Sequence, residues 1–412
     1  MKIAMISEHA SPLARLGEVD AGGQNVHVAA LSAALAERGH QVVVYTRRDS
    51  AELPERVPMG PGVRVEHITA GPARPIPKDD LLPHMKPFAA QLCRRWRLWR
   101  PDVVHAHFWM SGVAAQAAVA TLDTSTAMDD PPIPVAQTFH ALGSVKRRWQ
   151  SAADTSPAER IGIERRIARS ADRIIATCSE EVTELRRLGA TAASIDVIPC
   201  GVDTELFTPD GPAEPRSDRQ RIVCVGRLVP RKGVDDVIRA VLGLPDVELL
   251  IAGGPPADRL DGDVEVARLR ALAGDSAAIR LLGQLSHDRL PSLLRSADLV
   301  VCAPWYEPFG IVPLEAMACG VPVLATAVGG LLDTVLPWQT GVLVPAKDPE
   351  ALRAAISRLL ADADLRRALA EAGARRARDC YSWPAIAAAT EGSYQSMLDA
   401  QQASRIVLGA AR

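Results

Sequence analysis

The stretch from Trp305 to Val321 reads WYEPFGIVPLEAMACGV and places two glutamates, Glu307 and Glu315, eight residues apart. Strand-like apolar segments stand on both sides of it, at 298–302 and 321–326. The first glutamate therefore falls on a strand-to-helix loop broken by proline and glycine, and the second on the helix that follows. A parallel α/β sheet presents a binding site at the carboxyl ends of its strands in this way, and the helix start suits a phosphate.

The composition describes an ordinary globular protein of 412 residues, long enough for two or three domains. Apolar residues make up 48% and charged residues 23%, and the net charge of −2 argues against a nucleic-acid-binding surface. The seven cysteines contain no C-x-x-C pair, so we expect a reducing cytoplasm and neither a disulfide framework nor a zinc site. We expect no signal peptide, because Glu8 and His9 interrupt the first apolar run. We expect no membrane-spanning segment, because no apolar stretch approaches about 18 residues.

Two successive α/β halves are predicted along the chain. Strands, glycine turns and amphipathic helices alternate in both halves, and a proline-rich polar segment separates them. Strands are expected at 2–7, 40–47, 63–68, 101–107, 134–139 and 172–178, and again at 221–226, 248–254, 279–282, 298–302 and 321–326. We predict an N-terminal domain over 1–207, a hinge over 208–220, a C-terminal domain over 221–380 and a last helix over 381–412.

Residues suited to an anionic ligand follow several of these strands. Gly22 and Gly23 open a helix, where paired glycines let a ligand approach the backbone. Arg227 and Lys232 follow the first strand of the second half, and two fixed cations can neutralise a diphosphate. The D-x-D at 261–263 has a spacing used for divalent metals, but it precedes a helix without a second carboxylate cluster. We therefore expect it to cap that helix or lie on the surface.

Ordinary structural interpretations stay open for the histidines and for several arginines. His105 and His107 share one strand face but lack a third ligand, so we expect a structural or site-lining role and no metal. A lone histidine such as His140 more often packs in a core. The cations at 94–100 and 146–148 are more often a solvated face than a ligand site.

The segment EPFGIVPLE resembles the E-x7-E signature of retaining glycosyltransferases of family 4, which have the GT-B fold. The segments G-R-L…K-G at 226–233, T-x-H-x-L-G at 138–143 and I-P-x-G-V-D at 198–203 are similar to the family pattern as well. DAGGQNVHV and HAHFW point to the branch of sucrose-phosphate synthases and inositol-phosphate glycosyltransferases. The resemblance implies two Rossmann-like doubly wound domains facing across a cleft, with the last helix crossing back onto the first domain.

The resemblance also implies roles for matched residues. Arg227 and Lys232 would hold the donor diphosphate, Glu307 the sugar hydroxyls and Glu315 the nucleotide ribose, while His140 would contact the transferred sugar. The implied catalytic residues are His140, Arg227, Lys232 and Glu307. The implied donor-binding residues are Gly23, Arg227, Lys232, Glu307, Phe309, Gly310, Ile311 and Glu315. The implied acceptor-binding residues are Gly22, Gly23, Asn25, Lys78, Phe108, Thr138 and Arg147.

We therefore predict a cytoplasmic, retaining transferase that needs neither a metal nor another cofactor. It would move a sugar from a nucleotide sugar, with a UDP-sugar favoured, to a small sugar or polyol acceptor that is anionic or phosphorylated. Phe108 lacks the hydroxyl found at this position in the inositol-phosphate branch, so we do not expect the acceptor to bind as it does there. The sequence leaves a homodimer open. Alternatives are a nucleotide-sugar epimerase, a non-catalytic nucleotide-sugar-binding protein, and a transferase using a GDP-sugar and a lipid-linked acceptor.

Overall fold

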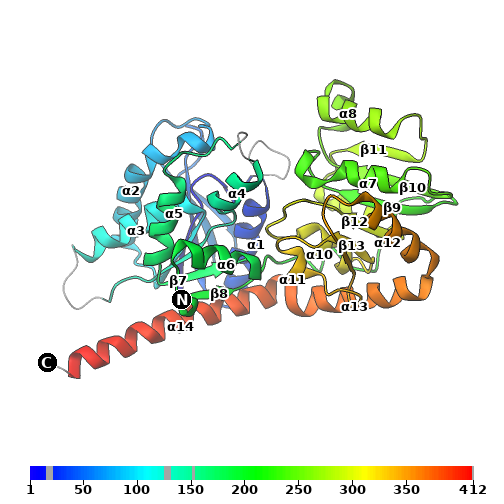
Figure 1. The fold of residues 1–412 in the computed structure, drawn as a ribbon. Helices are drawn as coiled ribbons and strands as arrows, with labels where there is room; N and C mark the ends of the chain where they lie inside the picture. The colour runs from blue at the N-terminus through cyan, green and yellow to red at the C-terminus, as the bar shows by residue number, and fades with distance from the viewer. Residues whose placement is uncertain (15–21, 125–130, 151–153, 411–412) are drawn as a thin grey trace. The chain divides into compact units, whose positions relative to one another are not determined.

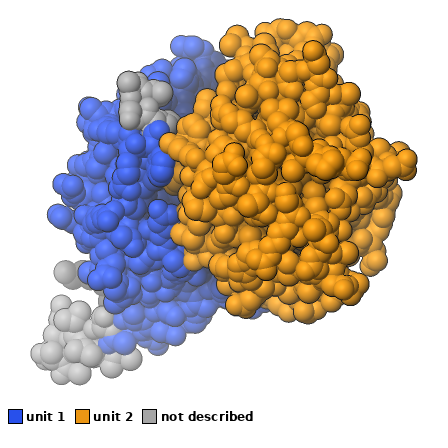
Figure 2. Space-filling view, turned by 45° about the vertical axis from the view of Figure 1, so that its right-hand side comes forward, with its two compact units in different colours: residues 1–199, 384–412 blue, residues 200–383 orange. Residues whose placement is uncertain are grey.

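The computed structural model describes residues 1–14, 22–124, 131–150 and 154–410, and its contacts divide the chain into two compact units (Figure 2). Unit 1 comprises Met1–Pro199 and Pro384–Arg412, and unit 2 comprises Cys200–Trp383. In this division the segment 208–220, predicted as a hinge, lies within unit 2. Most of the last helix belongs to unit 1.

Unit 1 is built on an eight-stranded sheet with the order β3-β4-β2-β1-β5-β6-β7-β8, parallel except for the β3–β4 pair. Its strands are β1 (Lys2–Ile6), β2 (Gln41–Arg47), β3 (Arg56–Gly60), β4 (Val63–Ile68), β5 (Val103–His107), β6 (Val135–Thr138), β7 (Arg173–Ala176) and β8 (Ile195–Val197). Its helices are α1 (Gly23–Glu37), α2 (Met85–Leu98), α3 (Trp109–Asp123), α4 (Gly143–Gln150), α5 (Arg160–Ser170), α6 (Ser179–Leu188) and α14 (Trp383–Ala410). Short 3-10 turns are η1 (Lys78–Asp80), η2 (Leu82–His84) and η4 (Ala192–Ser194).

The central strands of unit 1 form because their apolar runs can be covered on both faces. All but the first residue of β1 and of β2 is buried, as parallel strands with helices on both sides require. The structure adds β3, β8, α3 and α4, which the sequence did not predict. β3 is an antiparallel edge strand that tolerates Pro58. α3 is rich in alanine, and its even apolar distribution hides the helical period.

Unit 2 is built on a six-stranded, wholly parallel sheet with the order β11-β10-β9-β12-β13-β14 (Figure 1). Its strands are β9 (Gln220–Val225), β10 (Val247–Ala252), β11 (Ile279–Gly283), β12 (Leu299–Cys302), β13 (Val323–Thr326) and β14 (Val342–Val344). Its helices are α7 (Val234–Val241), α8 (Val264–Ala273), α9 (Leu290–Arg295), α10 (Ile311–Ala318), α11 (Leu331–Thr334), α12 (Pro349–Ala361) and α13 (Ala363–Tyr381). Short 3-10 turns are η5 (Pro230–Lys232), η6 (Ala257–Gly262) and η7 (His287–Arg289).

Two apolar clusters cover the two faces of the unit 2 sheet. One joins the sheet to α7, α8 and α12, and the other joins it to α9, α10 and α13. Helices on both faces of a parallel sheet make a doubly wound unit, so the prediction of two such halves is confirmed. Within the described ranges, no helix has both the length and the apolar content that crossing a bilayer requires.

Each sheet reverses its strand order once. In unit 1, β1 has β2 on one side and β5 on the other; in unit 2, β9 has β10 on one side and β12 on the other. Ligands of doubly wound sheets bind outside the carboxyl ends of the strands at this switch point. The loops after β1 and β5, and those after β9 and β12, are therefore the places to look for a site.

Helix α14 packs on unit 1 through polar contacts as well as apolar ones. Tyr394 donates its hydroxyl to His105 Nδ1 at 2.7 Å, in the middle of β5. Ser393 Oγ donates to Asp196 Oδ2 at 2.6 Å, on β8. The C-terminal helix thus reaches two strands of the first sheet.

Candidate active site

In unit 2 the loops after β9 and β12 lie against each other. Trp305 N–H donates to the carbonyl of Arg231 at 2.8 Å, and Arg231 Nη1 donates to the carbonyl of Tyr306 at 3.3 Å. Gly233 has a φ of +64°, and a Cβ at this position would stand 1.9 Å from the carbonyl oxygen of Ala303. Only glycine allows this approach, so the K-G dipeptide fixes the spacing of the two loops.

This approach pairs the lysine predicted to hold a diphosphate with the first glutamate of the motif. Lys232 Nζ donates to the Glu307 carboxylate, and the two side chains are 21% and 14% exposed. Burial alone would raise the pKa of Glu307. Lys232, together with Arg231 and the backbone N–H of Phe309, outweighs burial and holds that pKa below its ordinary value. The switch point of unit 2 therefore carries a fixed cation beside an ionised carboxylate.

The other donor residues predicted in unit 2 lie on the same loops. Arg227 is exposed and lies two residues after the end of β9. Burial, followed by repulsion from Arg227, lowers the pKa of Arg231, so several cationic groups gather in this loop. Gly310, at φ +78°, precedes α10, whose first residue is Ile311.

Glu315 lies on α10 and is 6% exposed. Within the described residues its carboxylate has one polar partner, His287, whose Nε2 lies 3.4 Å from Oε1. Burial raises the pKa of Glu315, and the hydrogen bond to Glu315 raises the pKa of His287. A buried carboxylate with spare acceptor capacity suits a ligand that offers hydroxyl groups. No local pattern marked His287 as a site residue, because it lies 28 residues before Glu315.

In unit 1 the loop after β1 is joined to the ends of β5 and α1. Glu8 N–H donates to Ser111 Oγ at 3.1 Å, and the Ser111 hydroxyl donates to the Glu8 carboxylate. Gln24 Nε2 donates to Ser7 Oγ at 3.1 Å and to the His107 carbonyl at 3.3 Å. These contacts hold the two sides of the unit 1 switch point together.

Four buried imidazoles gather beside this switch point: His27, His105, His107 and His140. His107 Nδ1 and His140 Nε2 lie 3.0 Å apart, and the rings of His105 and His107 are 4.0 Å apart. Burial lowers the pKa of His27 to about 4 and that of His105 to about 3, and lowers those of His107 and His140 well below the ordinary value. Neighbouring imidazoles add to this effect, so the cluster is neutral at physiological pH. Among the described residues, no group of three or more His, Cys, Asp or Glu side chains could hold a metal ion.

Thr138, predicted to bind the acceptor, lies inside this cluster with no exposed surface. Its hydroxyl donates to the carbonyl of Ile175 at 3.1 Å and therefore accepts from His105 Nε2 at 2.9 Å. His105 in turn accepts from Tyr394 through Nδ1. The Thr138 hydroxyl thus takes part in a buried hydrogen-bond chain that holds His105 on β5.

Two candidate residues of unit 1 have backbone conformations that are rare for residues other than glycine. Phe108 has a φ of +79° and His140 a φ of +60°. Such conformations cost about 1–3 kcal/mol each and are concentrated at binding and active sites. Phe108 N–H donates to the Thr138 carbonyl at 2.8 Å, so both residues stand at the carboxyl ends of neighbouring strands.

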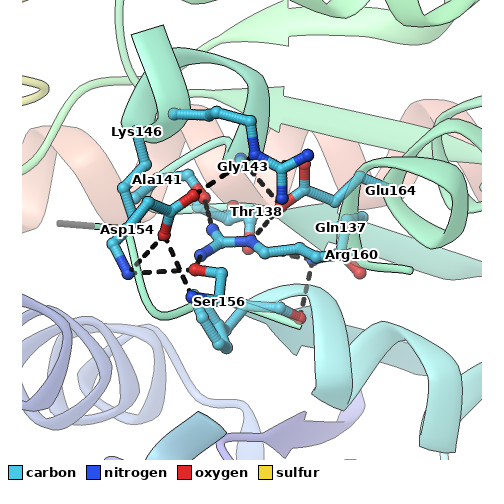
Figure 3. Close-up of polar contacts among 11 residues, drawn as sticks. Gln137, Thr138, Ala141, Gly143, Lys146, Asp154, Ser156, Arg160 and Glu164 are labelled. Carbon is cyan, nitrogen blue, oxygen red and sulfur yellow. Dashed lines mark hydrogen bonds and ion pairs between the residues drawn. The ribbon is translucent and has the colours of Figure 1, made fainter. Parts of the chain in front are cut away.

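Two cations flank the ring of Phe108. Arg160 Cζ lies 5.0 Å and Lys78 Nζ 5.7 Å from the ring centroid. Figure 3 shows Arg160 at the centre of a polar network, in which its Nε donates to Glu164 at 2.7 Å and its Nη1 to Ser156 Oγ at 3.1 Å. Sequence reasoning missed Arg160, because an arginine at a helix start carries no local signal of a site.

The structure gives the remaining acceptor residues local partners. Arg147 is exposed, and its Nε lies 3.6 Å from Asp154 Oδ2. Asn25 is buried; its side chain accepts from Gly22 N–H at 3.0 Å and donates to the Ser11 carbonyl at 2.9 Å. The Asn25 amide thus closes the turn before α1, which begins at Gly23.

The D-x-D segment behaves as the sequence predicted. Asp263 caps α8 by accepting from Val266 N–H at 2.9 Å, and Asp261 forms a surface ion pair with Arg270.

In a comparison with known proteins, each half of the chain matches a glycosyltransferase family model. Residues 211–376 match the family model described as Glycosyl transferases group 1, and residues 21–206 match the model Glycosyltransferase Family 4. The chain is 36% identical over 406 residues to a D-inositol 3-phosphate glycosyltransferase of Xylanimonas cellulosilytica, covering 94% of this chain and 95% of that protein. It is 35% identical over 418 residues to the enzyme of the same name from Mycobacterium tuberculosis, covering 98% of this chain and 85% of that protein.

Solved structures of other proteins also superpose over nearly the whole chain. Sucrose-phosphate synthase from Thermosynechococcus elongatus superposes with a TM-score of 0.83 at 33% identity, covering 97% of this chain and 99% of that one. Anabaena HepE, solved in complex with UDP and glucose, superposes with a TM-score of 0.72 at 21% identity, covering 96% of this chain and 100% of that one. Both likenesses extend over unit 1 and unit 2.

Proposed function

Because the chain belongs to glycosyltransferase family 4 and has a GT-B fold, we propose that it is a retaining, metal-independent transferase. It moves a sugar from a nucleotide sugar to a hydroxyl of a small anionic polyol or sugar. The observation that carries this proposal is the Lys232–Glu307 pair at the switch point of unit 2, with Arg227 on the same loop as Lys232. A diphosphate needs fixed cations there, and a sugar needs a fixed hydrogen-bond acceptor beside them.

In this proposal unit 2 binds the donor. The diphosphate lies against Arg227 and Lys232, and the buried Glu315 carboxylate accepts hydrogen bonds from the ribose hydroxyls. Glu307 binds hydroxyls of the sugar; an ionised carboxylate has about four acceptor positions, so it does this while remaining in contact with Lys232. Fixed cations beside a departing diphosphate stabilise the charge that develops on it, worth about 2.7–4 kcal/mol for each contact.

The reaction we propose is a front-face displacement. The acceptor oxygen forms a bond to C1 of the sugar while the bond from C1 to the diphosphate oxygen breaks, and the proton of the acceptor hydroxyl passes to the departing diphosphate. The chain contributes chiefly position and electrostatic stabilisation. His140 is neutral because burial lowers its pKa, so it acts as a hydrogen-bond partner of the sugar.

Unit 1 binds the acceptor in this proposal. Lys78 and Arg160 flank Phe108 and can hold a phosphate or another anionic group by charge-assisted hydrogen bonds, each worth about 1.5–3 kcal/mol. The relatives named above carry D-inositol 3-phosphate in their names. Phe108 supplies no hydroxyl, so we expect a related anionic polyol or sugar that relies on the cations alone.

A thermal-shift screen tests the donor. UDP-glucose is the first candidate because of the branch resemblance, and a fold neighbour, HepE, was solved with UDP and glucose. A ligand present at 100 times its Kd stabilises the folded protein by about 2.7 kcal/mol. We expect a clear rise in Tm with UDP and UDP-sugars. A rise with GDP-sugars alone would indicate the GDP-dependent alternative, and no rise with any nucleotide would contradict the proposal.

A further inference from the structure

Gln137, on β6, joins two backbone carbonyls at the carboxyl ends of neighbouring strands. The side chain is buried, and its Nε2 donates to the Phe108 carbonyl at 3.1 Å and to the Thr138 carbonyl at 3.0 Å. Phe108 follows β5, which pairs with β6. One side-chain amide therefore ties together the two strand ends beside which the acceptor is proposed to bind, and the proposed roles give this amide no task.

The two contacts determine which way the amide faces. A backbone carbonyl only accepts hydrogen bonds, so the NH2 group of Gln137 must face Phe108 and Thr138. The amide oxygen Oε1 is then turned toward Gly112 on α3, where an added Cβ would stand 2.2 Å from it. Oε1 is buried, and within the described ranges it has no hydrogen-bond partner.

Neither carbonyl depends on Gln137 for a partner. The Phe108 carbonyl also accepts from the Gly112 N–H at 3.1 Å, and the Thr138 carbonyl also accepts from the Phe108 N–H at 2.8 Å. Loss of the amide would leave both carbonyls paired, whereas the amide itself leaves Oε1 buried and unsatisfied. The desolvation cost of such a group is comparable to the net gain from two neutral hydrogen bonds. Stability of the fold therefore gives little reason for a glutamine at this position.

The amide holds the backbone of Phe108 in an unusual conformation. Phe108 has a φ of +79° and a ψ of 156°, a region of backbone space that is almost restricted to glycine. Such a conformation persists only where the surrounding contacts fix it. With Phe108 held in this way, its ring centroid lies 5.0 Å from Arg160 Cζ and 5.7 Å from Lys78 Nζ.

We propose that Gln137 is a positioning residue of the acceptor site: it keeps Phe108 in its strained conformation and so sets where Arg160 and Lys78 meet an anionic group. This role rests on the proposed function. Gln137 acts through Phe108 and touches neither substrate. Because the phenyl ring lies between the two cations, its displacement should affect a phosphorylated acceptor more than a neutral one.

A glycine on α3 leaves the space that this amide needs. A Cβ on Gly112 would stand 2.2 Å from Gln137 Oε1, 3.2 Å from Gln137 Cδ and 3.0 Å from Ile167 Cδ1. Inside a helix, glycine is less favourable than alanine, so α3 itself gains nothing from it. The obstructing atoms are the ends of flexible side chains, so Gly112→Ala should displace the amide and leave the fold intact. This substitution removes the contact with Phe108 without changing Gln137.

Steady-state kinetics test the role with two probes, D-inositol 3-phosphate and inositol. Gln137→Met removes the amide and keeps the length of the side chain. In Gln137→Met and in Gly112→Ala we expect KM for D-inositol 3-phosphate to rise at least about 10-fold, as for one weakened charge-assisted contact. We expect a smaller rise for inositol, no change in KM for UDP-glucose, and no fall in Tm for Gln137→Met. Gly392→Ala is the matched control, because Gly392 lies on α14 and an added Cβ would have nothing within 4 Å.

Two kinetic results would overturn this role. A lower Tm in Gln137→Met with unchanged KM would show that the amide only stabilises the fold. Equal rises in KM for the phosphorylated and the neutral acceptor would show that the amide does not act through the cations beside Phe108.

Crystal structures of Gln137→Met and Gly112→Ala give a readout that depends on no acceptor. We expect Phe108 to leave positive φ in both, with its ring displaced from Arg160, and to stay as in the wild type in Gly392→Ala. If Phe108 keeps a φ near +79° and its ring position in both variants, the proposed role of Gln137 is wrong even if sugar is transferred normally. Failure to transfer sugar from any nucleotide sugar counts against the proposed function alone, and the two structures then still decide the role of Gln137.

Discussion

The switch points of the two units differ in their charge. In unit 2 a lysine and a glutamate form a direct ion pair, and a second glutamate is buried close to a histidine whose pKa is raised. In unit 1 four neutral imidazoles lie beside the switch point, and the cations lie beside Phe108. The same sheet topology therefore presents two different chemical surfaces.

From this difference we infer which substrate each unit binds in the proposed reaction. A fixed ion pair suits the partner whose charge changes during the reaction, because preorganised charges stabilise it without rearranging. Neutral imidazoles suit hydroxyl groups, with which they form hydrogen bonds without the cost of burying a charge. Unit 2 therefore fits the nucleotide diphosphate, and unit 1 fits a hydroxyl-rich acceptor with one anionic group.

The largest expected effect tests the charged side of the comparison. Lys232→Ala should lower kcat/KM by a factor of about 10²–10³, because a preorganised charge is lost beside the diphosphate. This factor corresponds to a loss of about 2.7–4 kcal/mol of transition-state stabilisation. Arg227→Ala should act in the same direction. Arg270→Ala is the matched control, since Arg270 forms a surface ion pair with Asp261. Steady-state kinetics check this, and near-normal turnover in both site variants would rule out the diphosphate assignment.

A smaller effect is expected on the acceptor side. Lys78→Ala should weaken the binding of a phosphorylated acceptor by about 1.5–3 kcal/mol, the usual range for a hydrogen bond to a charged group. The KM for the donor should not change. The measurement compares KM for D-inositol 3-phosphate and for inositol in the wild type and in the variant. If the neutral acceptor is preferred and Lys78→Ala changes nothing, the acceptor is not held by its charge.

Substitutions of the two glutamates of the motif should have different effects on the affinity for the nucleotide alone. Glu315→Gln should weaken the binding of UDP by roughly 1.5 kcal/mol, which raises Kd about tenfold, because a charged partner of the ribose becomes neutral. Glu307→Gln should weaken the complete donor while affecting UDP less. Calorimetry with UDP and with UDP-glucose decides the matter, and equal losses for both variants would contradict the division of roles.

His287 should make stability depend on pH. The hydrogen bond to Glu315 raises the pKa of His287 in the folded protein, and burial raises that of Glu315. The folded state then binds more protons than the unfolded state, so this contribution is full below the unfolded histidine pKa and is lost as pH rises through the folded pKa. We expect the wild type to exceed His287→Gln in free energy of unfolding more at about pH 6 than at about pH 8. Urea titrations check this, and a difference that grows with pH would contradict it.

No effect is expected from a chelator. In the proposed reaction, Arg227 and Lys232 would supply the positive charge that a metal would otherwise bring to the diphosphate. Transfer rates with and without EDTA should therefore agree. Abolition by EDTA and recovery with Mg²⁺ or Mn²⁺ would require a metal that these cations do not replace.

The sequence predicted what is encoded locally. The central strands appear in the sequence as short apolar runs. The K-G dipeptide and the E-P-F-G segment marked the two loops that the structure brings together through Gly233 and Glu307. Arg160 and Gln137 escaped prediction because they meet at Phe108 only through the sheet topology, from segments far apart in the chain. His287 escaped for the same reason, since a loop after β11 brings it to α10.

Product analysis tests the central claim most directly. The full chain is incubated with UDP-glucose and D-inositol 3-phosphate or a hexose phosphate, and the products are identified by mass spectrometry and NMR. We predict release of UDP together with a glycoside that keeps the anomeric configuration of the donor, and loss of both in Lys232→Ala. An isomerised nucleotide sugar without UDP release, or no product from any nucleotide sugar, would contradict the account.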